Sequence, residues 1–254
     1  MAQKRLDILL CERGLCKSRE EAQAHILAGA VWSGERRLDK AGTKYPEDIP
    51  LDLQSRALPF VSRAGLKLAH ALQVFGLDVN DKVCLDIGAS TGGFTDCLLQ
   101  NGARHVFAVD VGYGQLDAKL RNDPRVTCRE RINARYLRRE ELGRGELENE
   151  ISFIVMDVSF ISLNKILESI RPEFENVKDW VLLFKPQFEV GPAHIGKGGL
   201  VRSQKAVEDS LAAFEEFMRQ GGFIRRHGPE ASPVAGKKSG NQEYLIHYEL
   251  TSNG

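Results

Sequence analysis

The sequence predicts an α/β protein in two domains: a small α+β domain, then a larger domain with a mostly parallel sheet that ends in an antiparallel strand. Three observations lead to this prediction. The pattern of apolar and polar residues changes near residue 60. From about residue 79, apolar strand-like runs alternate with amphipathic helical patterns, which is typical of a parallel sheet covered on both faces. Near the C-terminus, two strand-like runs follow each other with only a loop between them. We expect domains at residues 1–58 and 66–254, joined by a linker at 59–65.

The composition is that of a globular protein. Of 254 residues, 42% are hydrophobic and 28% are charged, which excludes disorder, collagen and a small disulfide scaffold. Basic and acidic residues number 35 each, so the net charge indicates neither a nucleic-acid nor a membrane partner. No apolar run approaches the roughly 20 residues of a membrane-spanning helix, and the N-terminal apolar patch is too short for a signal peptide. We therefore expect a cytoplasmic protein with no membrane contact.

The cysteines give no sign of a metal or of disulfides. There are five, none in a Cys-x-x-Cys pair and none with a matching histidine cluster. We interpret them as reduced thiols in a cytosol and expect no bound metal. Because no heptad seam or large apolar stripe is visible, we expect a monomer with no obligate protein partner.

Two short helices and a set of short strands are predicted before residue 58. Leu6, Leu9 and Leu10 mark one face of the first helix. The second helix, over about 19–28, begins at the capping box of Ser18 and Glu21 and ends near a glycine. Short strands follow up to residue 53.

Basic residues gather at this end of the chain. Up to residue 19, five basic residues stand against two acidic ones: Lys4, Arg5, Arg13, Lys17 and Arg19. A solvated helix surface is the simple interpretation. However, the order Arg5-Leu6-Asp7, Gly14-Leu15, Ser18-Arg19, Ala22, Ile26, Gly29 and Val31 resembles the RNA-binding module of small-subunit ribosomal protein S-four. That resemblance implies contacts to structured RNA through shape and phosphates.

The larger domain shows four buried strands and a terminal pair. Strand-like runs cover 83–87, 105–110, 153–157 and 180–185, with helices starting near residues 94, 115, 162 and 203. Two further strands cover 223–226 and 243–248. An antiparallel pair at the end of such a sheet is typical of a Rossmann-like class I methyltransferase more than of a dehydrogenase.

A glycine-rich turn after the first strand predicts a cofactor site. Asp86 ends that strand, glycines follow, and Asp110 ends the next strand, where a carboxylate binds a ribose diol. There is no dinucleotide Gly-x-Gly-x-x-Gly and no phosphate loop. An acid before the turn repels pyrophosphate but attracts an ammonium group, which favours S-adenosylmethionine. A turn whose glycines only permit tight packing is the alternative. The expected cofactor residues are Asp86, Gly88, Ala89, Ser90, Thr91, Gly92, Gly93, Phe94, Asp110, Val111, Asn133 and Asp157.

Four residues are candidates for a catalytic role: Lys67, Asp157, Lys185 and Glu243. Asp157 and Lys185 lie at the carboxyl ends of predicted strands, the edge where α/β sheets bind ligands. A lysine that interrupts an apolar strand, as Lys185 does, is costly to bury without a partner. The alternative is an edge position from which the amine reaches solvent.

Six motifs, in order, resemble one family. They are Val61-Ser62-Arg63, Gly65-Leu66-Lys67-Leu68, residues 86–95, 109–116 and 156–161, and Lys185-Pro186-Gln187-Phe188-Glu189. They look like the TlyA, or haemolysin A, family, whose catalytic domain is similar to FtsJ-type ribose methyltransferases. The resemblance implies methyl transfer from S-adenosylmethionine to the 2′-hydroxyl of a ribose in ribosomal RNA or ribosomal subunits. It also implies a catalytic tetrad of Lys67, Asp157, Lys185 and Glu243, and an RNA contact at Arg63.

The chemistry of such a transfer suits these side chains. A ribose hydroxyl is a poor nucleophile, so an enzyme must place it in line with the methyl group and remove its proton. Lys185 is the expected base, with burial and the nearby cation of Lys67 favouring an uncharged amine. Asp157 would hold both amines, Lys67 would also stabilise the developing alkoxide, and Glu243 would orient the ribose or balance charge.

Two other interpretations remain open. The protein could be a ribosome-assembly RNA-binding protein in which methyl transfer is incidental. It could also be a membrane-active haemolysin, although it lacks a strongly basic amphipathic helix.

A second basic stretch has two interpretations. Residues 119–139 hold eight basic and two acidic side chains, and residues 140–150 are acidic. The basic side chains could bind RNA phosphates, or they could pair with the acidic stretch that follows.

Overall fold

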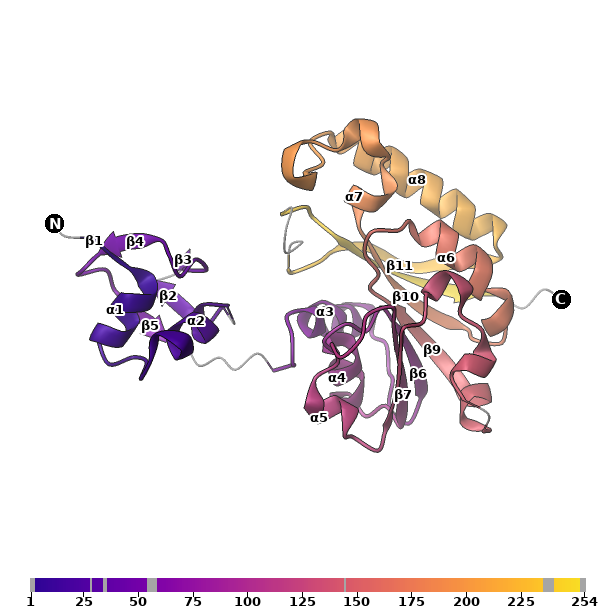
Figure 1. The fold of residues 1–254 in the computed structure, drawn as a ribbon. Coiled ribbons are helices and arrows are strands. Elements are labelled where there is room, and N and C mark those ends of the chain that lie inside the picture. Colours follow the sequence, from indigo (N-terminus) through magenta and orange to yellow (C-terminus); the bar gives the residue numbers. More distant parts are fainter. Residues whose placement is uncertain are drawn as a thin grey trace. The chain divides into compact units, whose positions relative to one another are not determined.

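The chain forms two compact units in a computed structural model, Met1–Pro59 and Phe60–Gly254. The structure describes residues 3–27, 29–33, 36–53, 59–143, 145–234 and 240–251 (Figure 1). Each unit has its own hydrophobic core.

The first unit combines two helices with short antiparallel strands. Its elements are β1 (Gln3–Arg5), α1 (Leu6–Glu12), α2 (Arg19–Leu27), β2 (Val31–Ser33), β3 (Arg36–Arg37), β4 (Lys44–Pro46) and β5 (Asp52–Leu53). Strand β1 pairs with β4, and β2 lies between β3 and β5. The predicted cap of α2 is half confirmed: Ser18 Oγ accepts from the backbone N–H of Glu21 at 3.2 Å, but the Glu21 carboxylate accepts from Lys17 N. Residue 28, where we predicted its end, lies outside the described residues.

The second unit is built on a seven-stranded sheet in the order β11-β12-β10-β9-β6-β7-β8. Strands β8, β7, β6, β9 and β10 are parallel, while β12 runs antiparallel between β10 and β11. The predicted fold class is therefore confirmed. The strands are β6 (Val83–Ile87), β7 (His105–Asp110), β8 (Val126–Glu130), β9 (Ile151–Met156), β10 (Asp179–Phe184), β11 (Phe223–Ala231) and β12 (Tyr244–Leu250).

Helices cover both faces of this sheet. They are α3 (Ala64–Phe75), α4 (Gly93–Gln100), α5 (Ala118–Arg121), α6 (Leu163–Ile170), α7 (Pro186–Glu189) and α8 (Gln204–Gln220). Short 3-10 turns are η1 (Ala134–Tyr136), η2 (Arg139–Glu141), η3 (Leu147–Glu150), η4 (Pro172–Phe174), η5 (Pro192–His194) and η6 (Lys197–Gly199). Apolar side chains of α3 and α4 form one core with one face of the sheet. Those of α6 and α8 form another core with the opposite face.

Strand β8 was not predicted from the sequence. It lies at the edge of the sheet beside β7, and all five of its residues are only partly buried. Its sequence, Val-Thr-Cys-Arg-Glu, therefore carries no continuous apolar run of the kind that revealed the central strands.

The strand order places a ligand site between β6 and β9. The chain runs from β6 outward through β7 and β8, and then returns to the other side of β6 as β9. In open α/β sheets, ligands bind at such a reversal, outside the carboxyl ends of the strands. None of the helices in the described ranges is both long and apolar enough to cross a bilayer.

Candidate active site

Two adjoining cavities open at this carboxyl edge. The larger, of about 450 Å³, lies beside the ends of β6, β7 and β9, and the smaller, of about 170 Å³, extends toward the start of α3 and the end of β10. Both are lined by Gly88, Ser90, Asp157 and Ser159. They therefore form one continuous site.

The glycine-rich turn after β6 shapes the wall between these cavities. Gly88 has a φ of +87°, and a Cβ there would lie 2.5 Å from the backbone oxygen of Asp157. No larger residue fits without moving β6 away from β9. Gly92 and Gly93 are constrained differently, because added Cβ atoms would overlap Leu120 and Ser62. The packing alternative therefore describes Gly92 and Gly93, which line neither cavity.

Asp86 has an unused acceptor at the floor of this turn. Its carboxylate is fully buried, and Oδ2 accepts a hydrogen bond from Thr95 Oγ1 at 2.6 Å, but Oδ1 has no partner among the described residues. Burial raises the pKa of Asp86 to about 7, although the Thr95 hydrogen bond opposes the shift. A buried acceptor without a donor is costly. A cofactor carrying an ammonium group would supply that donor, so the residues present fit S-adenosylmethionine.

Asp110 is held rigidly at the mouth of the larger cavity. Its two carboxylate oxygens accept from the backbone N–H groups of Ser90, at 2.8 Å, and Gly112, at 2.6 Å. Each oxygen keeps acceptor capacity for a ribose hydroxyl. Val111 and Asn133 line the same cavity, and the Asn133 side chain also caps η1 by accepting from Arg135 N.

The segment before α3 is hydrogen-bonded to α4, the helix that follows the glycine-rich turn. The backbone N–H of Val61 donates to Asp96 Oδ2 at 2.8 Å, and Asp96 lies on α4. Arg63 is the residue directly before α3, and Ala64, its first residue, lines the smaller cavity. Lys67 follows Ala64 on the same helix by about one turn and is not one of the residues that line either cavity.

Lys67 and Glu243 form one buried ion pair. Lys67 Nζ lies 2.5 Å from Glu243 Oε2, and the two residues are 8% and 3% exposed. Glu243 directly precedes β12, so the pair joins α3 to the antiparallel end of the sheet. Gln187 Nε2 donates a longer hydrogen bond, of 3.5 Å, to the other Glu243 oxygen.

Asp157 and Lys185 form a second pair, between the ends of β9 and β10. Lys185 Nζ lies 2.5 Å from Asp157 Oδ1 and donates to Ser159 Oγ at 2.9 Å. Lys185 is 7% exposed, and β10 lies inside the sheet between β9 and β12. The alternative of an edge lysine that reaches solvent was wrong, because this amine is buried with partners.

The structure places the four predicted residues in two ion pairs rather than in one cluster around Asp157, and of these pairs Lys185–Asp157 is the one that lines the smaller cavity. We expected Asp157 to hold both amines, but Glu243 is the carboxylate against Lys67. Each cation is buried beside one anion, as a low-dielectric interior requires. Such a site can hold a hydroxyl, accept its proton and stabilise a developing negative charge.

The N-terminal basic residues have several partners within their own unit. Arg5 and Arg19 both bind the buried carboxylate of Asp7, at 2.9 and 3.0 Å. The Arg5 guanidinium lowers the pKa of Asp7 well below its usual range. Lys4 pairs with Glu12 and Glu47. Arg13 donates to the backbone carbonyls of Glu47 and Ile49, while the side chain of Lys17 is exposed.

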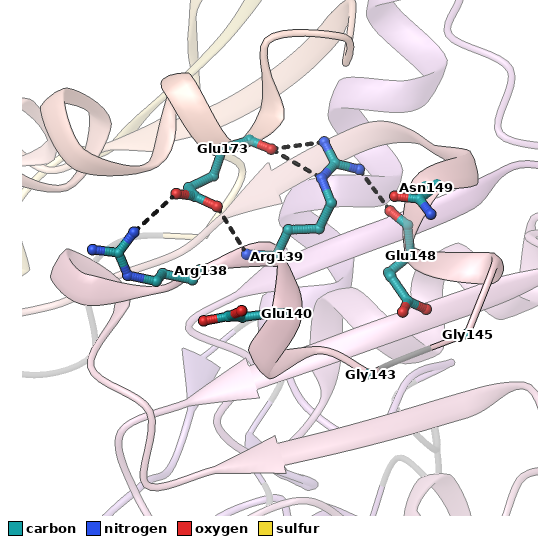
Figure 2. Close-up of a pocket in the computed structure, with 8 residues that line it drawn as sticks. All are labelled: Arg138, Arg139, Glu140, Gly143, Gly145, Glu148, Asn149 and Glu173. Atoms are coloured by element: carbon teal, nitrogen blue, oxygen red, sulfur yellow. Dashed lines mark hydrogen bonds and ion pairs between the residues drawn. The ribbon is translucent and has the colours of Figure 1, made fainter.

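Part of the second basic stretch is structural. Figure 2 shows a cavity of about 470 Å³ in which Arg138 and Arg139 both approach Glu173. The Arg139 guanidinium donates to the backbone oxygens of Glu173 and Glu148, and burial lowers its pKa. Arg138 pairs with the Glu173 carboxylate at 3.4 Å. These two arginines are therefore held by the protein itself, but the expected partner was wrong: the carboxylate that pairs with Arg138 belongs to Glu173, outside the acidic stretch at 140–150.

Several residues that line the cavities were not among the expected site residues. They are Ser62, Ala64, Val109, Gln115, Ile132, Ala134, Val158, Ser159, Phe160, Ile161 and Ile166. Ile132 and Ala134 stand on either side of the expected Asn133, after a strand, β8, that was not predicted. The residues directly after Asp157 could have been predicted, because they follow the carboxyl end of a predicted strand.

Comparisons with known proteins agree with this geometry. The FtsJ-like methyltransferase family model matches residues 60–250, and the S4 domain model matches residues 4–48. A Bacillus subtilis protein provisionally named an rRNA methyltransferase is 47% identical over 251 residues, which cover 99% of this chain and 87% of that protein. The 16S/23S rRNA (cytidine-2′-O)-methyltransferase TlyA of Mycobacterium tuberculosis is 41% identical over 243 residues, or 95% of this chain and 88% of that protein.

A solved structure matches both parts of the chain. It is a provisionally named haemolysin of Streptococcus thermophilus, 43% identical, with a TM-score of 0.74. The match covers 99% of this chain and 90% of that one. The resemblance inferred from the six motifs is therefore confirmed.

Proposed function

The chain belongs to the FtsJ-like methyltransferase family, and we propose that it transfers a methyl group from S-adenosylmethionine to the 2′-hydroxyl of a ribose in ribosomal RNA. The observation that carries this proposal is the buried pair of Lys185 and Asp157, which lies at the cavity beside the cofactor turn. Relatives at 41% and 47% identity carry rRNA methyltransferase names, and the matched S4 domain supports an RNA substrate.

Residues of the turn would hold the cofactor. Asp86 would receive its ammonium group, Asp110 its ribose hydroxyls, and Val111 and Asn133 would lie against the rest of the adenosine. The bound cofactor supplies a methyl group on a positively charged sulfur. Gly88 permits the close approach of β6 and β9 that forms the floor of the site.

The chain itself would supply the acid–base chemistry. Lys185 accepts the proton of the 2′-hydroxyl, and Asp157 holds its amine in place. Lys67 stabilises the negative charge that develops on the ribose oxygen, and Glu243 fixes Lys67. A positioned base contributes roughly 10²- to 10⁴-fold to such a step.

Basic side chains of both units would bind the RNA. Lys4, Arg5, Arg13, Lys17, Arg19 and Arg63 are the residues we propose. Among them, the exposed Lys17 is the best candidate for a phosphate contact. We further propose that the protein acts as a monomer in the cytoplasm, where ribosomes are found.

The test is transfer of labelled methyl from S-adenosylmethionine to unmethylated small subunits, large subunits and intact ribosomes. We expect label in RNA of at least one particle, and loss of at least about 10²-fold in Lys185→Ala. Lys205→Ala is the matched control, because Lys205 is an exposed lysine of α8 that pairs with Asp209. Cofactor binding without transfer to any particle, or near-normal turnover in Lys185→Ala, would contradict the proposal and favour the assembly-protein alternative.

A further inference from the structure

We propose that Ser159 is a positioning residue that orients the Lys185 amine toward the reacting hydroxyl; this inference rests on the proposed function. Ser159 follows Asp157 by two positions after β9, and it lines both cavities. Its Oγ accepts a hydrogen bond from Lys185 Nζ at 2.9 Å. It lies within the motif at 156–161, in which only Asp157 was expected to have a role.

The argument begins with the geometry of an amine. Lys185 Nζ is tetrahedral, and one of its four directions is occupied by the side-chain carbon. Ser159 Oγ accepts a hydrogen bond along one of the others, at 2.9 Å, and Asp157 Oδ1 is the ion-pair partner of the amine, at 2.5 Å. The Ser159 hydrogen bond therefore restricts the rotation of the amine. Lys185, Asp157 and Ser159 all line the smaller cavity, where a substrate hydroxyl would meet the amine.

The consequence appears when the amine acts as a base. An uncharged amine has two N–H bonds and one lone pair. Ser159 accepts one N–H bond of Lys185, which restricts rotation of the amine about its bond to the side-chain carbon, while Asp157 attracts the amine as its ion-pair partner. With Asp157 alone, the amine would rotate more freely, and the direction of the lone pair would no longer be restricted.

The group-transfer step that this orientation serves is balanced. The ribose 2′-oxygen gives its proton to the Lys185 lone pair and forms the new bond to the methyl carbon. The electron pair of the broken carbon–sulfur bond goes to sulfur, which becomes neutral. Lys185 is left as an ammonium paired with Asp157 and later loses its proton to water.

Ser159→Ala tests this role against Ser159→Thr, which keeps the hydroxyl. We expect Ser159→Ala to lower kcat about 10- to 100-fold, as small losses of alignment do, with KM for RNA and cofactor within about twofold of the wild type. Ser159→Thr should recover most of the loss. Ser210→Ala is the control, because Ser210 lies on α8, where its hydroxyl donates to the backbone oxygen of Val207.

Three outcomes would overturn the inference. They are a Ser159→Ala kcat within about twofold of wild type, a higher KM with unchanged kcat, or a Ser159→Thr variant as slow as Ser159→Ala. Thermal unfolding and cofactor titration of each variant separate misfolding from misalignment. If wild-type protein itself fails to methylate RNA in the same assay, the proposed function fails first, so the two failures are distinguishable.

Discussion

Two cavities of the larger unit have nearly the same volume and are both lined by charged residues, yet their surroundings differ in the burial of unpartnered polar atoms. In the cavity of about 470 Å³, the Arg139 guanidinium donates to backbone carbonyls, Arg138 faces Glu173, and the Glu140 carboxylate is exposed to solvent (Figure 2). The cavity of about 450 Å³ begins at Gly88, two residues after the fully buried Asp86, which lines neither cavity and keeps an oxygen without a partner in the described residues. Volume and charge therefore do not identify a ligand site, whereas a buried polar atom without a partner does indicate one.

The largest expected effect comes from breaking the Lys67–Glu243 pair. Lys67→Met leaves a buried carboxylate without its cation, so we expect a loss of about 3 kcal/mol in the free energy of unfolding and of most methyl transfer. The double variant Lys67→Met, Glu243→Leu should recover much of the stability but none of the activity. Urea denaturation and the labelled-methyl assay measure the two effects. Recovery of activity in the double variant would show that the pair is only structural.

Substitutions in the cavity of about 470 Å³ should lower the stability by less and leave turnover unchanged. Arg139→Leu leaves the carbonyls of Glu173 and Glu148 without donors, which should cost about 2 kcal/mol in unfolding free energy. Methyl transfer per folded molecule should stay within about twofold. Arg138→Leu removes one exposed pair and should change stability by less than about 0.5 kcal/mol. A large fall in turnover of folded Arg139→Leu would show that this cavity also takes part in methyl transfer.

The pKa of Asp86 predicts how pH affects cofactor binding. Because burial raises this pKa from 3.8 to about 7, the folded protein holds a proton here that the unfolded chain has already lost. The stability contribution of Asp86 in the cofactor-free protein therefore falls as pH rises from about 4 to about 7. Pairing with an ammonium group needs the carboxylate, so the cofactor Kd should fall as pH rises toward 7, by up to about tenfold per pH unit.

Calorimetric titration between pH 5.5 and 8 measures this dependence. Asp86→Asn is the control, since it retains any titration of the cofactor itself while removing that of the protein. Equal pH dependence in the two proteins would mean that Asp86 does not face the ammonium group.

The smallest effects are expected on the surface of the first unit. Lys17→Ala should weaken RNA binding a few-fold and reduce the slope of log K against log salt by about 1, with unfolding unchanged. Arg5→Ala differs, because Arg5 also neutralises the buried Asp7 and its loss should destabilise the unit. Salt-dependent binding and thermal unfolding distinguish them. An unchanged salt slope in Lys17→Ala would remove Lys17 from the RNA contacts.

The sequence predicted the central architecture because buried parallel strands leave a continuous apolar signal. The predicted runs at 83–87 and 105–110 coincide with β6 and β7. Edge strand β8 gave no such signal. Which side chains pair with each other was harder to predict. Lys67 and Glu243 are 176 positions apart, and no spacing rule says which carboxylate faces which amine. Ser159 lies in one of the six motifs, directly after a predicted strand, but its hydrogen bond with Lys185 became visible only in the fold.

The most direct test of the central claim is the chemical position of the transferred methyl group. A ribose methylated at the 2′-oxygen cannot be cleaved by alkali at the following phosphate, so label there remains in an alkali-resistant dinucleotide. After incubation of unmethylated ribosomal particles with labelled S-adenosylmethionine, we predict that wild-type protein and Lys205→Ala place label in such a dinucleotide, and that Lys185→Ala does not. Label released with mononucleotides would indicate methylation of a base and would contradict the account.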